Sequence, residues 1–465
     1  MPLDFYPYLA RHLLAPTLDA MRGAHTMRCL AQLEQSQWWP ASRLQGLQSE
    51  RLQRLVQHAY AHVPFYRETM AKHGLAPSDI RDVSDLVRLP ILSKTAVRTQ
   101  LPRLISDTCE PASLLRGTTS GSTGTPLVFY STRHDQIDRG YARTARAFQW
   151  AGLEIGDRFA YVGRLHNEPR LRGRVVQRAS NRAKRVMHVN PDQLEENRLA
   201  QTVDRLRRAR LHGLWGYPMS LAVIAEFIRR ESVQAPTLNS IVTGGAQLPP
   251  TARRLLTEVF GTEPHSKYAT TEVFGIASEC EAHEGLHVQA EDVIVEVVDD
   301  AGHPVPVDSH GRIIVTNLHN YGMPFIRYDI GDIGSLAEGT CTCGRALPRL
   351  ADIWGRNNSY ILTPAGRRVS SGGLHFERLA DLPVLQYQMV QEDIDTVILR
   401  LVPFEGLSST EQEDLKTAAR ALFADDLADI PSLTVELVQD IEPGPSGKHT
   451  FVFSRVARAI EGRGG

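Results

Sequence analysis

Between Gly117 and Pro126 the sequence contains a run of small polar residues whose composition predicts phosphate binding. All residues from Gly117 to Thr125, GTTSGSTGT, are glycine, serine or threonine. Glycines let backbone N–H groups approach a polyphosphate closely, and hydroxyl groups add further donors for its oxygens. No lysine stands at the spacing of the GxxxxGK[ST] loop, and a flexible linker is the alternative interpretation. The apolar segment LVFY (127–130) that follows directly favours a phosphate-binding turn.

A second group of reactive side chains consists of cysteines and histidines. Cys341 and Cys343 form a C-x-C pair, and Cys280 lies upstream with His283 and His287 close behind it. Three thiolates and one imidazole make a tetrahedral ligand set for structural zinc. The C-x-C spacing is tighter than the usual C-x2-C, and buried free thiols in a reduced protein are the alternative. On spacing alone, either histidine could be the fourth ligand.

Length and composition predict a globular protein of more than one domain. The chain has 465 residues, of which 42% are hydrophobic and 23% charged, and its formal net charge is -1. This neutral balance gives no general attraction to nucleic acid or to an anionic membrane. Five scattered cysteines do not suggest a secreted disulfide scaffold, and neither a signal peptide nor an apolar stretch of about 18 residues is evident. We therefore expect a cytoplasmic protein without a transmembrane segment.

One local charge cluster contrasts with this balance. Eight lysines and arginines lie between Arg164 and Arg185. They form either a solvated face or a surface for an anionic partner, such as a phosphate-bearing acceptor, a carrier protein or a membrane. No aromatic residues are interleaved there, so binding to single-stranded nucleic acid is not favoured.

The elements expected around these residues change in character along the chain. The first third is expected to be helical, with apolar residues at helical spacing over 51–63 and Pro64 ending or bending that helix. From 159 to 246, short strands such as 159–163 and 240–245 alternate with helices such as 221–228, which predicts a largely parallel sheet. Apolar runs at 293–298 and 312–316 flank turn residues at 299–302 and predict a β-rich region.

Beyond Arg356 the pattern is typical of a smaller domain. Strands at 396–402 and 433–438 enclose a helix over 411–423, and Ser408 with Glu411 forms its capping box. The order strand, helix, strand predicts a small α+β domain. We therefore expect an N-terminal domain over residues 1–356 and a C-terminal domain over residues 357–465.

Several segments together resemble the adenylate-forming superfamily of acyl-CoA synthetases, luciferases and peptide-synthetase adenylation domains. The stretch TTSGSTGTP is similar to that family's phosphate loop. The segments LVQHAYAHVPFYRE (55–68) and LPILSKTAVR (89–98) resemble the phenylacetate–CoA ligase branch, which includes capsule-biosynthesis proteins of the CapK type. The likeness extends from about Leu55 to Arg455, with the motifs in the family's order. It implies an α/β fold with layered sheets, a small β-barrel-like region and a mobile C-terminal domain.

The resemblance assigns nucleotide-binding roles to several motifs. In the segment YATTE, Tyr268 would stack on adenine, Thr271 would contact the α-phosphate, and Glu272 would help hold Mg²⁺. Asp332, at the end of RYDIGD, would accept hydrogen bonds from the ribose hydroxyls, and Arg356 in the GRNN hinge motif would contact the nucleotide. The remaining residues expected to line the ATP site are Thr118, Thr119, Ser120, Gly121, Ser122, Thr123 and Gly124 of the phosphate loop, with Gly244, Gly245 and Ala246.

Two further positions bear on catalysis and on movement of the small domain. Lys448, in PSGKH, resembles the family's C-terminal catalytic lysine and would reach the carboxylate and the α-phosphate; a lone lysine is otherwise usually a solvated surface residue. Asn358 occupies the hinge position, where Asp is more common in this branch. Because Asn tolerates unusual backbone angles, rotation of the small domain stays feasible and only its extent is open.

The implied function is ATP-dependent activation of a small aromatic carboxylic acid to an acyl-adenylate, with release of pyrophosphate and transfer to coenzyme A. Its cofactors would be ATP, Mg²⁺ and structural Zn²⁺, which is implied because the branch often shows this set of three cysteines and a histidine. The match to the branch's GLH stretch makes His287 the preferred ligand, with His283 as the alternative. The CapK-type relatives imply an alternative in which an amine, a carrier or a polysaccharide accepts the acyl group. A nucleotide-binding protein without catalysis is a third hypothesis, disfavoured by Lys448, Glu272 and Asp332.

Some features of this function stay open at the level of sequence. Trp215 and Tyr217 could line the acid pocket or belong to the core. The acid, the acceptor and the oligomeric state are not determined, and a homodimer is one option.

Overall fold

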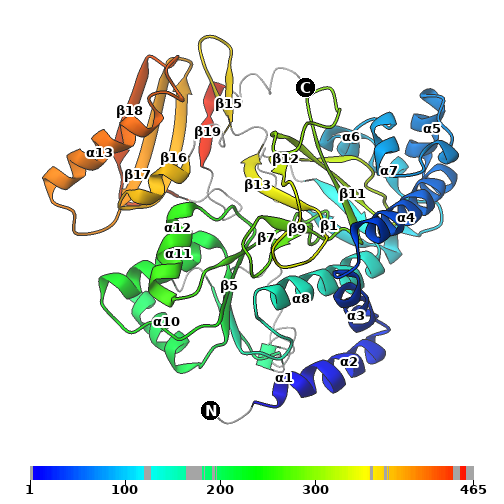
Figure 1. The fold of residues 1–465 in the computed structure, drawn as a ribbon, viewed down its shortest axis with the longest axis horizontal. Coiled ribbons are helices and arrows are strands. Elements are labelled where there is room, and N and C mark those ends of the chain that lie inside the picture. The colour runs from blue at the N-terminus through cyan, green and yellow to red at the C-terminus, as the bar shows by residue number, and fades with distance from the viewer. Residues whose placement is uncertain are drawn as a thin grey trace. The chain divides into compact units, whose positions relative to one another are not determined.

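In the computed structural model of the protein, residues 4–119, 127–163, 181–182, 184–190, 194, 196–356, 360–370, 374, 376–442 and 451–456 are described (Figure 1). Packing divides the chain into two units. The first comprises Met1–Asp157 and His265–Ile353, and the second Arg158–Pro264 and Trp354–Gly465. The domain boundary that the sequence predicts after residue 356 does not coincide with this division by packing. The two predicted domains, 1–356 and 357–465, stay a prediction.

The first unit begins with helices. They are α1 (Tyr6–Leu9), the π-helical turn η1 (Ala10–Leu14), α2 (Ala15–Arg22), α3 (Thr26–Ser36), α4 (Ala41–His62), α5 (Pro64–Lys72), α6 (Lys94–Thr99), α7 (Leu101–Leu104), the π-helical turn η5 (His134–Arg139) and α8 (Gly140–Trp150), with shorter turns η2 (Pro77–Asp79), η3 (Val83–Arg88) and η4 (Pro111–Ser113). Helix α4 buries Leu52, Leu55 and Val56 at the expected spacing. It ends at His62, and Pro64 begins α5, as predicted.

The strands of the first unit form a hairpin and a sheet. Strands β1 (Leu115–Thr118) and β2 (Val128–Ser131) pair antiparallel. The sheet contains β7 (His265–Tyr268), β8 (Ala277–Glu279), β9 (Leu286–Val288), β10 (Val293–Val298), β11 (Gly311–Asn317), β12 (Tyr328–Leu336) and β13 (Arg349–Arg356), in the order β10-β11-β12-β13-β9-β8-β7. Strands β10 and β11 match the two apolar runs predicted around the turn at 299–302, and their buried valines and isoleucines pack with the buried leucines and Val56 of α4 in one core.

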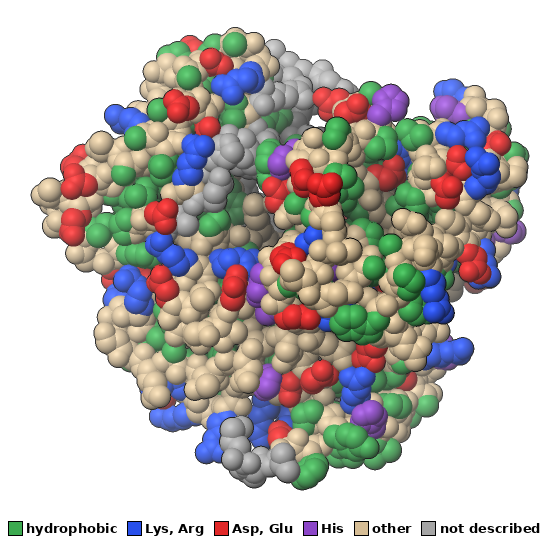
Figure 2. All heavy atoms as spheres, in the orientation of Figure 1, with side chains coloured by type: hydrophobic (Ala, Val, Ile, Leu, Met, Phe, Trp, Pro, Cys, Tyr) green, Lys and Arg blue, Asp and Glu red, His purple; other side chains and the backbone are tan. Residues whose placement is uncertain are grey.

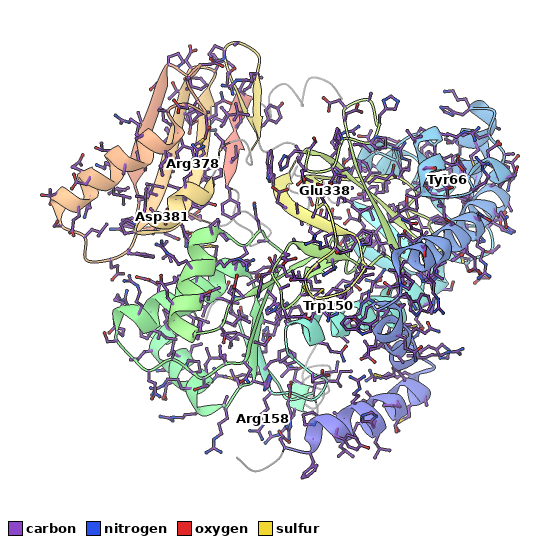
Figure 3. All side chains as sticks on the ribbon, in the orientation of Figure 1. Tyr66, Trp150, Arg158, Glu338, Arg378 and Asp381 are labelled. Atoms are coloured by element: carbon purple, nitrogen blue, oxygen red, sulfur yellow. The ribbon has the colours of Figure 1, made fainter. Side chains whose placement is uncertain are left out.

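Tyr66 of α5 links this helix to the segment before β12 through hydrogen bonds (Figure 3). Its hydroxyl donates a hydrogen bond to the Pro324 carbonyl over 2.8 Å and accepts one from the Ile326 N–H over 3.1 Å. The side chain is buried, so these bonds satisfy a polar group inside the core and fix α5 against the segment that enters β12.

The second unit contains a parallel sheet and a smaller mixed sheet. Parallel strands β3 (Phe159–Val162), β4 (Val186–Val189), β5 (Gly213–Gly216) and β6 (Ser240–Gly244) alternate with α10 (Glu196–Arg208), α11 (Pro218–Arg230) and α12 (Pro250–Phe260). The smaller sheet contains β16 (Val384–Asp393), β17 (Thr396–Pro403), β18 (Ser432–Leu437) and β19 (Val452–Ser454) in the order β18-β17-β16-β19, with α13 (Ser409–Phe423); the hairpin β14 (Tyr360–Leu362) and β15 (Arg368–Ser370) and the turn η7 (Phe376–Asp381) precede it.

Both sheets confirm the predicted α/β character. The capping box at Ser408 is present, because its hydroxyl accepts from the Glu411 N–H over 3.3 Å and Glu411 accepts from the Ser408 N–H over 2.7 Å. Among the residues that the structure describes, no helix is both long and apolar enough to cross a bilayer.

Candidate functional site

Two residues expected to hold a nucleoside lie side by side in the first unit. Tyr268 is the last residue of β7, and Asp332 lies within β12. The Tyr268 hydroxyl donates a hydrogen bond to Asp332 Oδ2 over 2.7 Å. Asp332 is buried and Tyr268 half-buried, and the hydrogen bond holds the aromatic ring and the carboxylate together.

Glu272 is fixed in the turn that follows β7. Its Oε1 accepts a hydrogen bond from the Tyr328 hydroxyl over 2.9 Å, and its Oε2 accepts one from the Thr271 hydroxyl over 3.1 Å. The turn is closed by the Thr270 hydroxyl, which accepts from the Val273 N–H over 3.0 Å. Glu272 is buried and Thr271 exposed, so the turn offers a positioned carboxylate beside an accessible hydroxyl.

Strand β12 brings these two pairs together. Tyr328 and Asp332 are four residues apart, and one binds Glu272 while the other binds Tyr268. Tyr328 was not predicted as a site residue. Its place in RYDIGD, an even number of residues before Asp332, is the only sequence signal that could have indicated it.

A bulge in β12 sets the position of Asp332. The pairing of β12 with β11 shifts register between Arg312 and Ile314, where β12 contains extra residues. Gly331 lies in this stretch with a φ of 77°, in the left-handed region that glycine adopts without strain. The bulge therefore turns the backbone immediately before Asp332.

Two side chains support the bulge. Asp329 Oδ1 accepts a hydrogen bond from the Gly331 N–H over 2.8 Å, and Lys94 Nζ donates to the Ile330 carbonyl over 2.6 Å. Lys94 belongs to the LPILSKTAVR segment, which was recognised only as a point of resemblance. The structure gives it a local role, because it binds the backbone that carries Asp332.

The hairpin β1–β2 forms the base of the predicted phosphate loop. The Thr119 N–H donates to the Leu127 carbonyl over 2.9 Å, and the Leu127 N–H donates to the Thr119 hydroxyl over 3.1 Å. A Cβ atom on Gly117 would lie 2.2 Å from the Phe129 ring, so this position requires glycine. The residues Ser120, Gly121, Ser122, Thr123 and Gly124 lie outside the described part of the chain.

In the second unit, Gly244 is the last residue of the parallel strand β6, and Gly245 follows it. Gly245 has a φ of 77°, and a Cβ atom there would lie 2.6 Å from the Tyr217 ring. Trp215 packs against Tyr161 with ring centroids 4.5 Å apart, and all three aromatic side chains are half-buried. They lie at or just beyond the carboxyl ends of parallel strands, where ligands commonly bind in such sheets.

Several other predicted positions are not placed. Ala246 is half-buried beyond β6, and Arg356 ends β13 with its side chain outside the description. Asn358, Lys448 and the arginine-rich stretch at 164–178 lie outside the described residues. Their roles stay predictions.

The predicted metal ligands form a compact cluster in the first unit. The ligand atoms of Cys280, His287, Cys341 and Cys343 all lie within 4.8 Å of one another. The sulfurs of Cys280 and Cys341 are 3.7 Å apart, and Cys343 Sγ lies 3.3 Å from His287 Nε2. Tetrahedral zinc, with bonds of about 2.3 Å to sulfur and about 2.0 Å to nitrogen, would place such atoms about 3.8 Å and about 3.5 Å apart.

The second histidine lies apart from this cluster. His283 Nδ1 lies 3.4 Å from Glu279 Oε2, and its ring packs against His265. The turn between the histidines contains Gly285, where a Cβ atom would lie 2.5 Å from the Leu350 carbonyl oxygen. This close approach sets β9 beside β13 and places His287 against the cysteine pair.

Protonation of the cluster fits metal binding. Burial lowers the pKa of His287 to about 4, so its imidazole is neutral at pH 7, and its Nδ1 faces the Leu347 carbonyl at 3.4 Å. Burial raises the pKa of Cys280 to about 12, so this thiol stays protonated unless a cation compensates for the charge of its thiolate. A bound metal supplies such a cation, and the neutral imidazole is the form that coordinates it.

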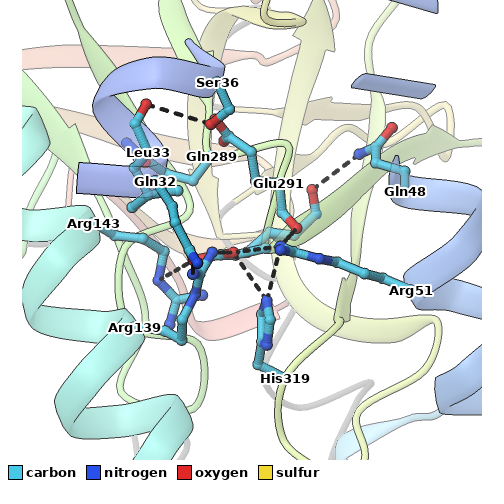
Figure 4. A network of polar contacts seen from close by, with 12 residues as sticks. Gln32, Leu33, Ser36, Gln48, Arg51, Arg139, Arg143, Gln289, Glu291 and His319 are labelled. Atoms are coloured by element: carbon cyan, nitrogen blue, oxygen red, sulfur yellow. Dashed lines mark hydrogen bonds and ion pairs between the residues drawn. The ribbon is translucent and has the colours of Figure 1, made fainter. Parts of the chain in front are cut away.

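A buried ionic network, which was not predicted, lies elsewhere in the first unit (Figure 4). Arg139 donates to Asp292 Oδ2 over 3.0 Å, and Arg146 pairs with Glu291 over 2.7 Å. The other groups around Asp292 are Arg51 at 3.1 Å, His319 at 3.0 Å and Arg143 at 3.9 Å. The i, i+4, i+7 spacing of arginines 139, 143 and 146 was the available signal, but Glu291 and Asp292, with which they pair, lie about 150 residues further along the chain.

Comparison with known proteins complements this geometry. No family model matches the chain. The phenylacetate–coenzyme A ligase of Thermus thermophilus is 30% identical over 338 residues, which cover 70% of this chain and 72% of the ligase. The phenylacetate–coenzyme A ligase of Escherichia coli is 26% identical over 333 residues, covering 69% and 72%. Protein CapK of Staphylococcus aureus is 23% identical over 417 residues, covering 88% and 89%.

Solved structures share the fold. The crystal structure of 2-hydroxyisobutyryl-CoA ligase in the postadenylation state superposes with a TM-score of 0.73 at 22% identity, over 92% of this chain and 93% of that one.

Proposed function

The chain belongs to the phenylacetate–coenzyme A ligase family, and on that premise we propose that it activates a small carboxylic acid with ATP and transfers the acyl group to coenzyme A. The observation that carries this proposal is the convergence of Tyr268, Glu272 and Asp332 through β12. Tyr268 would supply a ring to stack on the purine of ATP, and Asp332 a carboxylate to bind its ribose. Glu272 would supply a carboxylate for the divalent cation that accompanies the phosphates. We further propose that Thr118, Thr119 and the loop they begin bind its phosphates.

In the first proposed step, a carboxylate oxygen of the acid attacks the α-phosphorus of ATP. A bond forms from that oxygen to phosphorus, the bond from the α-phosphorus to pyrophosphate breaks, and the acyl-adenylate remains. Mg²⁺, when bound, would neutralise charge on the phosphate oxygens. Glu272 is already oriented by Tyr328 and would hold this cation, while the Thr271 hydroxyl and Lys448 would stabilise charge at the α-phosphate.

In the second step, the thiol of coenzyme A attacks the acyl carbon. The bond from that carbon to AMP breaks, the thioester forms, and the thiol proton passes to solvent. Asp332 would retain the ribose through both steps, because the supported bulge of β12 fixes its position independently of the acid. Residues 357–465, which we propose to be a mobile small domain turning about Asn358, would carry Lys448 away between the steps.

We propose that Cys280, His287, Cys341 and Cys343 hold structural zinc. All four positions of a tetrahedral site would be filled by protein ligands, which leaves no open position for a substrate. Arg345 helps to position one of these ligands. Its backbone N–H donates to Cys343 Sγ over 3.5 Å, and its guanidinium pairs with Glu281. Reduced thiols of this kind also suit a cytoplasmic location.

The aromatic side chains of Trp215 and Tyr217 in the second unit support the proposal that the substrate is an aromatic acid. Phenylacetate is the acid in the names of the curated ligases, and Trp215 with Tyr217 would offer flat apolar contacts to its ring. Protein CapK supports the alternative, in which an amine, a carrier or a polysaccharide takes the acyl group instead of coenzyme A.

An ATP–pyrophosphate exchange screen over aryl, fatty and amino acids tests the proposal. We expect exchange with at least one aryl acid and, on adding coenzyme A, release of AMP with thioester in equal amounts. AMP released only with an amine or carrier acceptor would select the CapK-type alternative. Exchange with none of the acids would refute acid activation.

A further inference from the structure

Lys267 is a buried cation next to the proposed nucleoside site. It precedes Tyr268 in β7 and is only 8% exposed, whereas lysine and arginine side chains usually reach water, as the blue side chains on the face drawn in Figure 2 do. The Lys267 Nζ donates a hydrogen bond to the Thr144 hydroxyl over 3.0 Å and lies 4.8 Å from the centre of the Phe274 ring. No carboxylate among the described residues forms an ion pair with it. The ammonium group is therefore shielded from water without a counter-charge from these residues.

Arg143 of α8 adds further donors close to this ammonium group (Figure 4). Its Nη2 donates to Asp135 Oδ1 over 3.3 Å, but its Nε and Nη1 are buried and have no hydrogen-bond acceptor among the described residues. Burial lowers the pKa of Lys267 to about 8, and the nearby charge of Arg143 contributes to this shift, so at pH 7 both groups are cations. Buried charges and buried donors without partners are costly, which is the arrangement expected where an anion binds.

The turn after β7 connects Lys267 to the proposed reaction centre. The turn carries Thr271, which we assign to the α-phosphate, and Phe274, whose ring lies beside the Lys267 ammonium group. It is closed by the Ile276 N–H, which donates to the Tyr268 carbonyl over 2.9 Å. Successive side chains of a strand point to opposite faces, so Lys267 lies on the α8 side of β7, away from the Tyr268 ring and its purine. An acid whose carboxylate meets the α-phosphate at Thr271 would have this side of the turn left for its other end.

We propose that the activated acid carries a second carboxylate, and that Lys267 and Arg143 bind it. This inference rests on the proposed activation of an acid by ATP. One oxygen of the second carboxylate accepts from Lys267 Nζ and the other from Arg143 Nη1, which supplies the missing counter-charge and the missing acceptor together. An acid with an apolar end would leave both cations unpaired, so the site discriminates against it. A benzene ring with two carboxylates meets this requirement and the proposed preference for an aromatic acid.

Pyrophosphate exchange with matched pairs of acids tests the proposal: isophthalate and terephthalate against benzoate, and succinate against butyrate. We expect kcat/KM for at least one diacid to exceed that of its monocarboxylate partner at least about tenfold. Lys267→Met should lower this ratio at least about tenfold, whereas Lys72→Met, at an exposed position of α5, should leave it unchanged. Exchange with monocarboxylates alone would overturn the second carboxylate and retain acid activation. Exchange with no acid at all would refute acid activation itself.

Two further measurements test the anion site without turnover. In calorimetry with AMP present, the same diacids should bind Lys267→Met at least about tenfold more weakly than wild type. The variant should unfold at a temperature no lower than wild type, because methionine fills a similar volume and removes a buried charge. Diacids that bind both proteins equally, or bind neither, would overturn the proposal. A variant that unfolds at a lower temperature with an unchanged diacid preference would show that Lys267 serves the fold instead.

Discussion

Asp332 illustrates how a single residue depends on its backbone. Its carboxylate accepts from Tyr268, while the bulge before it is held by Asp329 and Lys94. The contacts involve two strands and a distant helix, so the carboxylate is positioned before any ligand is present. A ribose bound there would meet an acceptor that needs little rearrangement.

We expect Asp332→Asn to raise the KM for ATP at least about tenfold, because hydrogen bonds to a charged group contribute ~1.5–3 kcal/mol. Pyrophosphate exchange measured against ATP concentration would show the change. Asp300→Asn, at an exposed turn, is the control and should leave the KM unaltered. An unchanged KM in the Asp332 variant would place the ribose elsewhere.

The ionisation of Asp292 also depends on its neighbours, and here the consequence is for the stability of the fold. Burial alone would raise its pKa, yet the charges of Arg139, His319 and Arg143 hold the pKa well below its ordinary value of 3.8. Since the folded-state pKa is depressed, the carboxylate adds stability above about pH 4. This contribution is lost as the pH falls from there through the folded-state pKa.

We expect Asp292→Asn to destabilise the first unit by ~3–5 kcal/mol at pH 7, because it leaves buried arginines without their counter-charge. Urea unfolding would measure the loss, and the difference from wild type should shrink as the pH is lowered below about 4. Glu338→Gln, an exposed carboxylate labelled in Figure 3, should have little effect at either pH. A constant difference at all pH values would show that the charge of Asp292 is not the cause.

At the scale of elements, the β1–β2 hairpin constrains the predicted phosphate loop. Gly117 faces the Phe129 ring, and the Thr119–Leu127 hydrogen bonds close the loop at its base. A side chain at Gly117 must displace either the ring or the strand. The described end of the loop is therefore tied to the packing of Phe129 in the core.

We expect Gly117→Ala to lower kcat/KM for ATP roughly tenfold, because the clash shifts the strand that leads into the loop. Gly46→Ala is the matched control. Gly46 lies in α4 with no atom within 4 Å of an added Cβ, so that variant should retain full activity and gain slight stability. Equal activity of both variants would show that the hairpin tolerates the displacement.

Elements with strong local patterns were predictable, whereas the links between them were not. Strands β3, β6, β10 and β11 and helix α13 follow from apolar runs and from the Ser408 capping box, and all of them are confirmed. The bulge in β12 and the role of Tyr328 depend on pairing with distant strands, which no local pattern encodes. The four ligands of the metal cluster were named from spacing and resemblance, and the structure brings them together. The burial of Lys267 was missed, because a lone lysine in a sequence is usually a solvated surface residue.

At the scale of the whole molecule, we expect metal to stabilise the first unit. A strong chelator should release zinc and lower the temperature of thermal unfolding by several degrees, because ligand binding adds to folding stability. Cys341→Ser should reproduce this effect without chelator, and Cys109→Ser, outside the cluster, should not. The metal content of the purified protein should be measured before the chelator is added. A protein without zinc at that stage would argue that the cysteines are free buried thiols.

In the proposed mechanism, adenylate formation and thioester formation use Lys448 differently, so the two steps involve both proposed domains. We expect Lys448→Ala to slow adenylate formation at least about 100-fold, because a charge is removed from the transition state. Thioester formation from a supplied acyl-adenylate and coenzyme A should be slowed much less. Near-normal adenylate formation in the variant would refute the role of Lys448.

Cys280 and Cys341 are 61 residues apart, and the four strands β9, β10, β11 and β12 lie in the stretch between them. An ion bound by both cysteines would tie this stretch into a closed ring of chain. A protease that cut at the exposed residues Asp299 and Asp300 would open the ring, yet both fragments would stay attached through the ion as well as through the sheet. The nicked protein would therefore separate into pieces only after both the ion and the sheet had been lost.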